Sequence, residues 1–295
     1  MIEQIRSGNA KSLARAISAI ENEQQGYEEV LRSLRTGSQA NVIGITGPPG
    51  AGKSTLVDAL IGELIKENTK IAILCVDPSS PFNLGALLGD RIRMSQWYNH
   101  PDVFIRSLAT RGSVGGLSPR IIEITDLIKS AGFDYVLVET VGVGQSEIEI
   151  AGLADTTVVV IVPESGDEIQ TMKAGLMEIA NIFVINKSDR PDADLFERNL
   201  RLMLAPSFTK QTRILPILKT VATERKGIAE LIIAIKNDLI EEKSDERRLS
   251  LLTDKAWQLL IHKKMKSVNK SQLYHAVQSE YKKEGFNLYR FIDLL

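Results

Sequence analysis

The sequence contains few of the residue types that build disulfide frameworks and metal clusters. Its 295 residues include one cysteine, Cys75, three histidines and only 5% aromatic residues. A single cysteine excludes an intramolecular disulfide, and the histidines are too few and too scattered for a structural zinc cluster. The same scarcity argues against a nickel- or zinc-delivery protein, because such proteins usually carry clusters of cysteine or histidine. We expect a cytoplasmic protein without a structural zinc site.

Long hydrophobic runs are missing as well. The longest run, from Thr156 to Pro163, has the length of a β-strand and is much shorter than the roughly 18 residues of a membrane span. The first residues, MIEQIRSGNAKSLARA, contain no apolar block of the secretory kind. Hydrophobic residues make up 43% and charged residues 25%, which is typical of a globular protein. We expect no membrane partner.

Neither sign of charge dominates the chain, but the charges are unevenly distributed. The net charge is −1, whereas the segment from Lys243 to the C-terminus contains 11 basic and 6 acidic residues. A basic segment can contact nucleic acid, although a solvated helix face is the commoner explanation. The segment has no arginine-rich run and no basic patch with interleaved aromatic residues. We therefore expect no nucleic-acid partner.

Short apolar strands alternate with helical patterns between Asn41 and about Leu239. Most of these strands are β-branched and apolar on both faces, as in a buried parallel sheet. The alternation predicts an α/β fold with a mostly parallel central sheet flanked by helices on both sides. The expected strands are Asn41–Thr46, Lys70–Val76, Val103–Ser107, Tyr135–Glu139, Thr156–Val162, Asn181–Asn186 and Ile214–Ile217.

Helical segments precede and follow this region. The first 37 residues place four apolar side chains on one helical face, those of Leu13, Ala16, Ile17 and Ile20. After the charged stretch EEKSDERR the pattern becomes helical again up to Leu295. The sequence thus predicts three parts: an N-terminal helical arm (1–37), a central α/β domain (38–242) and a C-terminal helical arm (243–295).

The strongest motif follows the first expected strand. It fits the pattern G-x-x-x-x-G-K-[ST], which is the phosphate-binding loop of P-loop NTPases. Glycines let backbone N–H groups curl around phosphate oxygens, and the N-terminus of the following helix adds partial positive charge. Lys53 is expected to reach the β- and γ-phosphates, and the Ser54 hydroxyl is expected to bind Mg²⁺. The motif consists of Gly47, Pro48, Pro49, Gly50, Ala51, Gly52, Lys53 and Ser54.

A second motif indicates which base is bound. Asn186-Lys187-Ser188-Asp189 follows the strand NIFVI and matches N-K-x-D, the guanine-reading loop of P-loop GTPases. The Asp189 carboxylate can accept hydrogen bonds from N1–H and the 2-amino group of guanine, whereas adenine has no such donor pair. A later loop, which contains Val221, Ala222 and Thr223, is expected to offer a backbone N–H to guanine O6. GTP and GDP are therefore the expected ligands.

Three acidic residues are candidates for the metal site beside Ser54. Glu139 ends a strand in Glu139-Thr140-Val141-Gly142, where P-loop GTPases have D-x-x-G and the Gly142 N–H would contact the γ-phosphate. Asp77 ends the strand IAILCV, and Asp90 follows in Gly89-Asp90-Arg91. Since a Mg²⁺ site uses one or two carboxylates beside phosphates and water, not all three need to contact the metal.

Several stretches resemble one protein family closely. They are VDPSSPFNLGALLGDRIRM from Val76, ETVGVGQSE from Glu139, PESGDEIQTMKAG from Pro163, and the NKSD loop. In their order and spacing, between about Gly37 and Ile240, they resemble the MeaB/ArgK family of G3E-class P-loop GTPases. Members of this family are GTPase chaperones of adenosylcobalamin-dependent methylmalonyl-CoA mutase. Some carry the label of lysine/arginine/ornithine transport ATPase or kinase.

The resemblance implies roles for residues in these stretches. Gly47 to Thr55 would form the phosphate loop, and Lys53, Glu139 and Lys173 would be catalytic. Asp77 and Asp90 would belong to switch I, and Glu139 would open switch II. The implied switch III, which links the nucleotide state to the mutase, contains Asp167, Gln170 and Lys173.

The resemblance also implies cofactors and partners. Mg²⁺ would accompany GTP or GDP, and this chain itself would bind no cobalamin. The implied partner is a B12-dependent acyl-CoA mutase, of which methylmalonyl-CoA mutase is the first candidate. The implied assembly is a homodimer held together mainly by helical arms, which suits the C-terminal segment.

The sequence departs from the familiar signalling GTPases directly after Gly142. Those proteins carry a water-orienting glutamine at the next position, where this chain has Val143. An aliphatic side chain cannot orient water, and Gln145 lies two residues further on. We therefore expect slow intrinsic hydrolysis and stimulation by a partner. Lys173 and Arg111 either supply positive charge that stabilises the transition state of phosphoryl transfer or are solvated surface charges.

The leading hypothesis is a GTPase whose cycle gates adenosylcobalamin loading and protection of an acyl-CoA mutase. A second hypothesis is a nucleotide-dependent accessory ATPase or kinase of a lysine/arginine/ornithine transport system. The N-K-x-D loop argues against ATP, and the sequence contains no kinase loop of the H-R-D type. A third hypothesis is a nucleotide-gated binding module with negligible turnover.

Overall fold

The computed structural model describes residues 2–34, 40–77, 94–110, 117–142, 146–165, 177, 179–204, 215–241, 245–265, 268–283 and 286–293. The chain divides into two compact units, Met1–Glu242 and Lys243–Leu295. The first unit contains the sheet and its flanking helices, and the second is helical.

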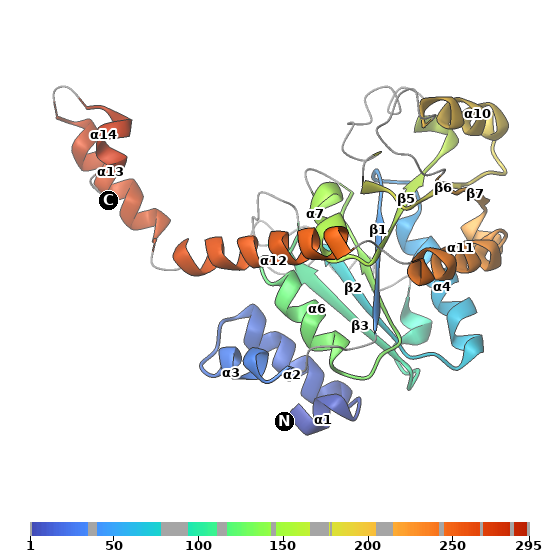
Figure 1. The fold of residues 1–295 in the computed structure, drawn as a ribbon, viewed down its shortest axis with the longest axis horizontal. Coiled ribbons are helices and arrows are strands. Elements are labelled where there is room, and N and C mark those ends of the chain that lie inside the picture. The colour runs from blue at the N-terminus through green and yellow to red at the C-terminus, as the bar shows by residue number, and fades with distance from the viewer. Residues whose placement is uncertain are drawn as a thin grey trace. The chain divides into compact units, whose positions relative to one another are not determined.

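The described part of the first unit contains a seven-stranded parallel sheet in the order β3-β2-β4-β1-β5-β6-β7 (Figure 1). Because the strands are parallel, their carboxyl ends lie along one edge of the sheet. β1 lies in the interior of the sheet, between β4 and β5. The strands are β1 (Asn41–Thr46), β2 (Ile71–Asp77), β3 (Val103–Ala109), β4 (Tyr135–Glu139), β5 (Thr156–Ile161), β6 (Ile182–Asn186) and β7 (Ile217–Thr220).

The α/β fold class expected from the sequence is confirmed, and six strands begin and end within two residues of their expected bounds. The seventh was placed wrongly, at Ile214–Ile217, because the observed strand begins where the expected one ends. Proline has no backbone N–H and cannot donate to a ladder. Pro216 accepts a hydrogen bond from the Phe183 N–H, and strand pairing with β6 starts one residue later, at Ile217.

Helices cover both faces of the sheet, and each helix buries an apolar side against it. One face, called the α4 face below, packs against α4 (Lys53–Leu64) and α11 (Ile228–Ile240). The opposite face, called the α6 face, packs against helices that bury residues such as Leu127 and Leu200. The helices on the α6 face include α2 (Ala10–Glu21), α3 (Tyr27–Arg32), α6 (Ile121–Lys129), α7 (Ser146–Leu153) and α10 (Ala193–Met203).

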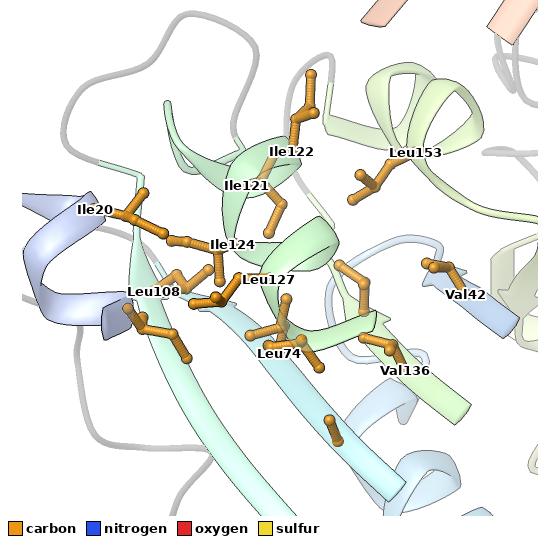
Figure 2. Packing of buried hydrophobic residues seen from close by; sticks show 14 of the residues in the cluster. Ile20, Val42, Leu74, Leu108, Ile121, Ile122, Ile124, Leu127, Val136 and Leu153 are labelled. Carbon is orange, nitrogen blue, oxygen red and sulfur yellow. The ribbon is translucent and has the colours of Figure 1, made fainter. Parts of the chain in front are cut away.

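Figure 2 shows the core on the α6 face. Ile124 and Leu127 of α6 lie over strand side chains such as that of Leu74, and Ile20 of α2 lies beside them. Full burial of one such aliphatic side chain stabilises the fold by about 1.5–3 kcal/mol. The apolar face expected in the first 37 residues is confirmed, since all four of its side chains are buried: Leu13, Ala16, Ile17 and Ile20.

An ion cluster around the buried Arg120 also joins the N-terminal helices to α6. The Arg120 guanidinium lies 2.7 Å from Glu123 and 2.6 Å from Glu23, and it stacks over the Tyr27 ring at 5.4 Å from the ring centre. Burial by itself would lower the pKa of Arg120, but hydrogen bonds to Glu123 and Glu23 outweigh it and raise the pKa above its ordinary value. The N-terminal helices are therefore held to α6 by both apolar and charged contacts.

The second unit consists of α12 (Asp245–Met265), α13 (Lys270–Tyr281) and α14 (Leu288–Ile292). Three aromatic rings pack together near its end: Phe286 lies 5.6 Å from Tyr281 and 6.1 Å from Phe291, measured between ring centres. Most other large apolar side chains of this unit are exposed, Trp257 among them. Among the described residues of the two units, no helix has the length and apolar character needed to cross a membrane.

Candidate functional site

The expected site residues that the structure describes meet at the carboxyl edge of the sheet. The strand order changes direction around β1, since the chain runs from β1 outward to β2 on one side and later fills β5, β6 and β7 on the other. In open α/β sheets, ligands bind at such a switch point, beyond the carboxyl ends of the strands. The segments that follow β1, β4, β6 and β7 all lie at this edge.

The phosphate loop runs from the end of β1 to the start of α4, as expected. Its first residue, Gly47, has φ 139°, a conformation that side chains rarely adopt. A Cβ atom at Gly47 would lie 1.9 Å from the Val160 carbonyl oxygen of β5. Glycine is therefore required here by the close approach of the loop backbone to the neighbouring strand.

Lys53 is the first residue of α4 and is 6% exposed. Its ammonium group donates hydrogen bonds to the carbonyl oxygens of Gly47, at 2.8 Å, and Pro48, at 3.1 Å. The charge is thus held within the curve of the loop, next to the first N–H groups of α4. A positive charge and a helix N-terminus together form a site suited to phosphate.

Ser54 and Glu139 lie next to each other although they are 85 residues apart in sequence. The Ser54 hydroxyl donates a 2.6 Å hydrogen bond to Oε1 of Glu139, and both residues are buried. Asp77 is also buried. It lies two residues after Cys75, the residue of β2 that pairs with Glu139 of β4. Hydroxyl and carboxylate oxygens are hard ligands of the kind that Mg²⁺ prefers.

The donor set fits a Mg²⁺ ion that is held partly by phosphate. Within the described residues, no three histidine, cysteine, aspartate or glutamate side chains come together as a metal-binding group. Mg²⁺ usually takes one or two carboxylates and completes its shell with phosphate and water. Asp90, the third acidic candidate, lies outside the described residues.

Gly142 packs against the phosphate loop from the β4 side. A Cβ atom at this position would lie 2.4 Å from the Gly47 carbonyl oxygen and 2.4 Å from the Lys53 ammonium nitrogen. Its φ of 85° is also in the left-handed region. The backbone after β4 therefore approaches the loop closely enough for its N–H groups to face the same ligand.

Asn186 connects the phosphate loop with both expected base-binding loops. Its side-chain amide donates to the Ala51 carbonyl at 2.9 Å, and its side-chain oxygen accepts from the Thr220 hydroxyl and the Ala222 N–H. The residue is 2% exposed, so these bonds are shielded from water. The motif predicted a nucleotide contact for Asn186, and the structure adds a bracing role that the motif did not suggest.

Lys187 and Asp189 follow Asn186 at the edge of the sheet. Lys187 has a left-handed backbone, and its ammonium group donates to the Gly50 carbonyl at 2.7 Å. Asp189 is exposed. Sequence reasoning missed Lys226, whose pKa is raised mainly by its hydrogen bond to Glu224 and to a smaller extent by the Asp189 carboxylate.

The second base-binding loop follows β7 and contains Val221, Ala222 and Thr223. The Val221 N–H donates to the Lys226 carbonyl at 3.1 Å, and the Ala222 N–H donates to Asn186. Val221 and Ala222 are buried, whereas Thr223 is exposed. Two of the three expected donors therefore already have partners inside the protein.

Trp97, which lies between β2 and β3 in the sequence, is bound to α4. Its indole N–H donates to Asp58 at 2.7 Å, and the Gln96 amide donates to the same oxygen at 2.8 Å. Asp58 lies one turn after Ser54. The sequence offered no signal for this link, because an aspartate inside a helix is an ordinary surface residue.

Together these elements give the carboxyl edge of the sheet an arrangement suited to a nucleotide, and the family comparison agrees. The family model described as "Methylmalonyl Co-A mutase-associated GTPase MeaB" matches residues 13–273. The chain belongs to the MeaB family of GTPases. The resemblance inferred from the motifs is therefore confirmed.

Relatives of this MeaB-family chain are similar over most of its length. It is 49% identical to a putative GTPase of Pyrococcus abyssi, covering 80% of this chain and 74% of that protein. It is 34% identical to a fused isobutyryl-CoA mutase of Geobacillus kaustophilus, covering 85% of this chain but 25% of that protein. A crystal structure of a LAO/AO transport system kinase matches with a TM-score of 0.69 and 26% identity, covering 99% of this chain and 94% of that one.

Several residues with expected roles lie outside the described part of the structure. They include the second switch I acid, the residues after Gly142 that bear on water activation, and the whole of the expected switch III triad. The residues concerned are Asp90, Arg111, Val143, Gln145, Asp167, Gln170 and Lys173. Their roles stay predictions.

Proposed function

We propose that this MeaB-family GTPase acts as a chaperone that gates adenosylcobalamin loading of a B12-dependent acyl-CoA mutase and protects the loaded enzyme. The observation that carries the proposal is the relative in which a region similar to 85% of this chain forms part of a fused isobutyryl-CoA mutase. A domain fused to an enzyme in one protein is a reasonable separate partner of a similar enzyme in another. The family description, which names association with methylmalonyl-CoA mutase, agrees with this.

The phosphates of GTP would lie in the loop from Gly47 to Thr55. Backbone N–H groups of the loop and of the α4 N-terminus would hold the phosphate oxygens. Lys53 would then exchange its bonds to the Gly47 and Pro48 carbonyls for bonds to the β- and γ-phosphates. The Gly142 N–H would meet the γ-phosphate from the β4 side.

Ser54, Glu139 and Asp77 would hold the metal site, with Asp90 as a further candidate. When bound, Mg²⁺ would supply positive charge beside the phosphates, where negative charge develops during phosphoryl transfer. Ser54 would bind it directly, and Glu139, at 2.6 Å from Ser54, would bind it directly or through water. Hydrolysis would be slow in the free chain, with Lys173 and the mutase supplying what the free site lacks.

Guanine would lie between Lys187 and the loop after β7. Asp189 would accept from N1–H and the 2-amino group, and Lys187 would cover one face of the base. Because the N–H groups of Val221 and Ala222 have partners in the protein, Thr223 is the residue of this loop that we assign to guanine O6. Asn186 would fix these loops relative to the phosphate site.

The proposal is tested by measuring GTP hydrolysis and adenosylcobalamin transfer with purified mutases. Methylmalonyl-CoA mutase and isobutyryl-CoA mutase are each mixed with the wild-type chain and with Lys53→Ala. We expect a mutase to accelerate hydrolysis by the wild type and GTP to control cofactor loading, with neither effect in Lys53→Ala. If neither mutase changes hydrolysis and GTP does not affect loading, the chaperone function is wrong.

The transport-kinase alternative makes a different prediction for the same preparation. The matching structure is named a LAO/AO transport system kinase, which favours keeping this alternative in the test. A kinase of that type would transfer the γ-phosphate of ATP to an acceptor protein. Incubation with labelled ATP and GTP separates the two, since the GTPase releases inorganic phosphate from GTP and labels no acceptor.

A further inference from the structure

Two threonine hydroxyls meet behind the phosphate loop, at the point where β1 and β4 end. Thr46 is the last residue of β1, and Thr140 directly follows β4. Their Oγ1 atoms lie 3.0 Å apart, and both side chains are almost completely buried. Burying a hydroxyl is unfavourable unless it forms a hydrogen bond. The two hydroxyls satisfy this requirement for each other.

The hydroxyl pair is also the last cross-link between the two strands before their chains separate. Ile45 pairs with Glu139, and the Thr140 N–H donates to the Ile45 carbonyl at 3.0 Å. Beyond this point one chain turns into Gly47 and the phosphate loop, and the other turns toward Gly142. The pair therefore lies one residue from the loop and two residues from Gly142.

The pair lies on the side of the sheet that faces away from Lys53 and Ser54. Side chains alternate between the faces of a strand. Glu139 points to the α4 face, where it accepts from Ser54, so Thr140 and its partner Thr46 point to the α6 face. The hydroxyls thus hold together the ends of β1 and β4 below the site, and they do not contact the ligand.

We propose that the Thr46–Thr140 hydroxyl pair is a positioning device for GTP hydrolysis. It sets the separation between the loop that carries Lys53 and the segment that carries Glu139 and Gly142. The γ-phosphate is the group that would contact both Lys53 and Gly142. A change in this separation therefore weakens binding of the triphosphate and of its transition state more than binding of GDP. The inference rests on the proposed roles of these residues in nucleotide binding.

The test removes the hydroxyls without changing side-chain shape. The variants are Thr46→Val, Thr140→Val, the double valine variant, and Thr46→Ser and Thr140→Ser. The matched control is Thr156→Val in β5, because Thr156 is fully buried and its hydroxyl has no hydrogen-bond partner in the described structure. Single-turnover hydrolysis, affinity for GDP and for a non-hydrolysable GTP analogue, and thermal unfolding are measured for each.

We expect each single valine variant to hydrolyse GTP about ten- to a hundredfold more slowly, as displacements of supporting structure typically do. Affinity for GDP should stay close to that of the wild type. The serine variants, which keep the hydroxyl, should hydrolyse at nearly the wild-type rate, and Thr156→Val should do the same.

The double valine variant separates positioning from simple stability. Each single variant leaves one buried hydroxyl unpaired, whereas replacing both partners with apolar groups of the same shape is often nearly neutral. The double variant should therefore recover thermal stability but remain as slow as the single variants. Recovery of both stability and rate, or serine variants as slow as the valine variants, would overturn the proposal.

The outcome is distinguishable from a failure of the proposed function. If the wild-type chain does not turn over GTP, the assigned chemistry is wrong. The hydroxyl pair is then judged by the ratio of affinities for the GTP analogue and GDP. Loss of triphosphate preference in both valine variants, kept in the serine variants, would support the pair, and an unchanged ratio would refute it.

Discussion

The carboxyl edge of the sheet, where the nucleotide is proposed to bind, is called the nucleotide edge here. Its buried polar side chains form hydrogen bonds within the protein, whereas in the second unit large apolar side chains face solvent. Lys53, Ser54 and Asn186 each have partners within the protein. In α12, Trp257 and Leu260 are 62% and 46% exposed. These polar groups of the first unit therefore have partners within the protein, while the second unit has an apolar surface of the kind that marks an interaction site.

Asp189, in contrast, is exposed at the nucleotide edge, and its substitution has the largest expected effect. Asp189→Asn should lower GTP affinity by about 10²- to 10⁴-fold, because the new amide cannot accept both guanine hydrogen bonds. The variant should prefer xanthosine triphosphate, whose 2-oxo group accepts from the amide. Calorimetric titration with GTP, ATP and xanthosine triphosphate measures the change.

Asp192→Asn is the matched control for this variant. Asp192 is exposed, lies three residues further on and makes no side-chain cap hydrogen bond to α10. It should leave all three affinities unchanged. Equal affinity of the wild type for ATP and GTP would contradict the assignment of the guanine loop.

The ion pair of Arg120 with Glu123 allows a buried pair to be compared with an exposed pair within the first unit. Arg120→Ala should destabilise the fold by about 3–5 kcal/mol, because it leaves the buried Glu123 carboxylate without its partner. The control is Arg32→Ala, which removes an exposed pair with Glu28 and should cost about 0–1 kcal/mol. Urea unfolding measures both. Equal destabilisation by the two variants would show that burial does not decide the strength of these pairs.

Much of this fold could be predicted from the sequence, because the patterns that indicate its strands and its phosphate loop lie within short stretches of the chain. Runs of β-branched residues marked six strands, and the glycine-lysine pattern placed the phosphate loop between β1 and α4. The seventh strand was misplaced because the apolar run before Pro216 outweighed the missing N–H of proline.

The contacts that organise the site could not be predicted in the same way. Asn186 reaches Ala51 across 135 residues, and Thr46 reaches Thr140 across 94. Trp97 binds Asp58 on a helix that precedes it by a whole strand. Such partners follow from the strand order, and a single sequence carries no local pattern for them.

Lys53→Ala tests the charged centre of the nucleotide edge. We expect hydrolysis to fall by about 10²- to 10³-fold, as it does when one preorganised donor to the transition state is removed. The control is Lys66→Ala, two residues beyond the end of α4, where the ammonium group is exposed and pairs with Glu63. Single-turnover assays compare the two variants. Wild-type hydrolysis by Lys53→Ala would exclude the proposed role.

The second unit should contribute least to nucleotide binding and most to assembly. Its exposed apolar side chains recur at helical spacing along α12, at Trp257, Leu260, Ile261 and Met265. An isolated helix in water is marginal, so this stripe needs a covering surface. A second copy of the chain is the proposed cover, because two-fold pairing is the commonest route to a homo-oligomer.

Deleting residues 243–295 should therefore convert a dimer into a monomer and leave GTP affinity unchanged, since the proposed phosphate- and base-contacting residues all precede this segment. The full-length variant Trp257→Asp/Leu260→Asp should also be monomeric, because a carboxylate is costly to bury in an apolar interface. Leu202→Asp, which places the same charge at an exposed apolar position of α10, should stay dimeric. Light scattering measures the mass of each form. A monomeric wild type, or a truncated chain that remains dimeric, would show that the C-terminal unit does not hold two copies together.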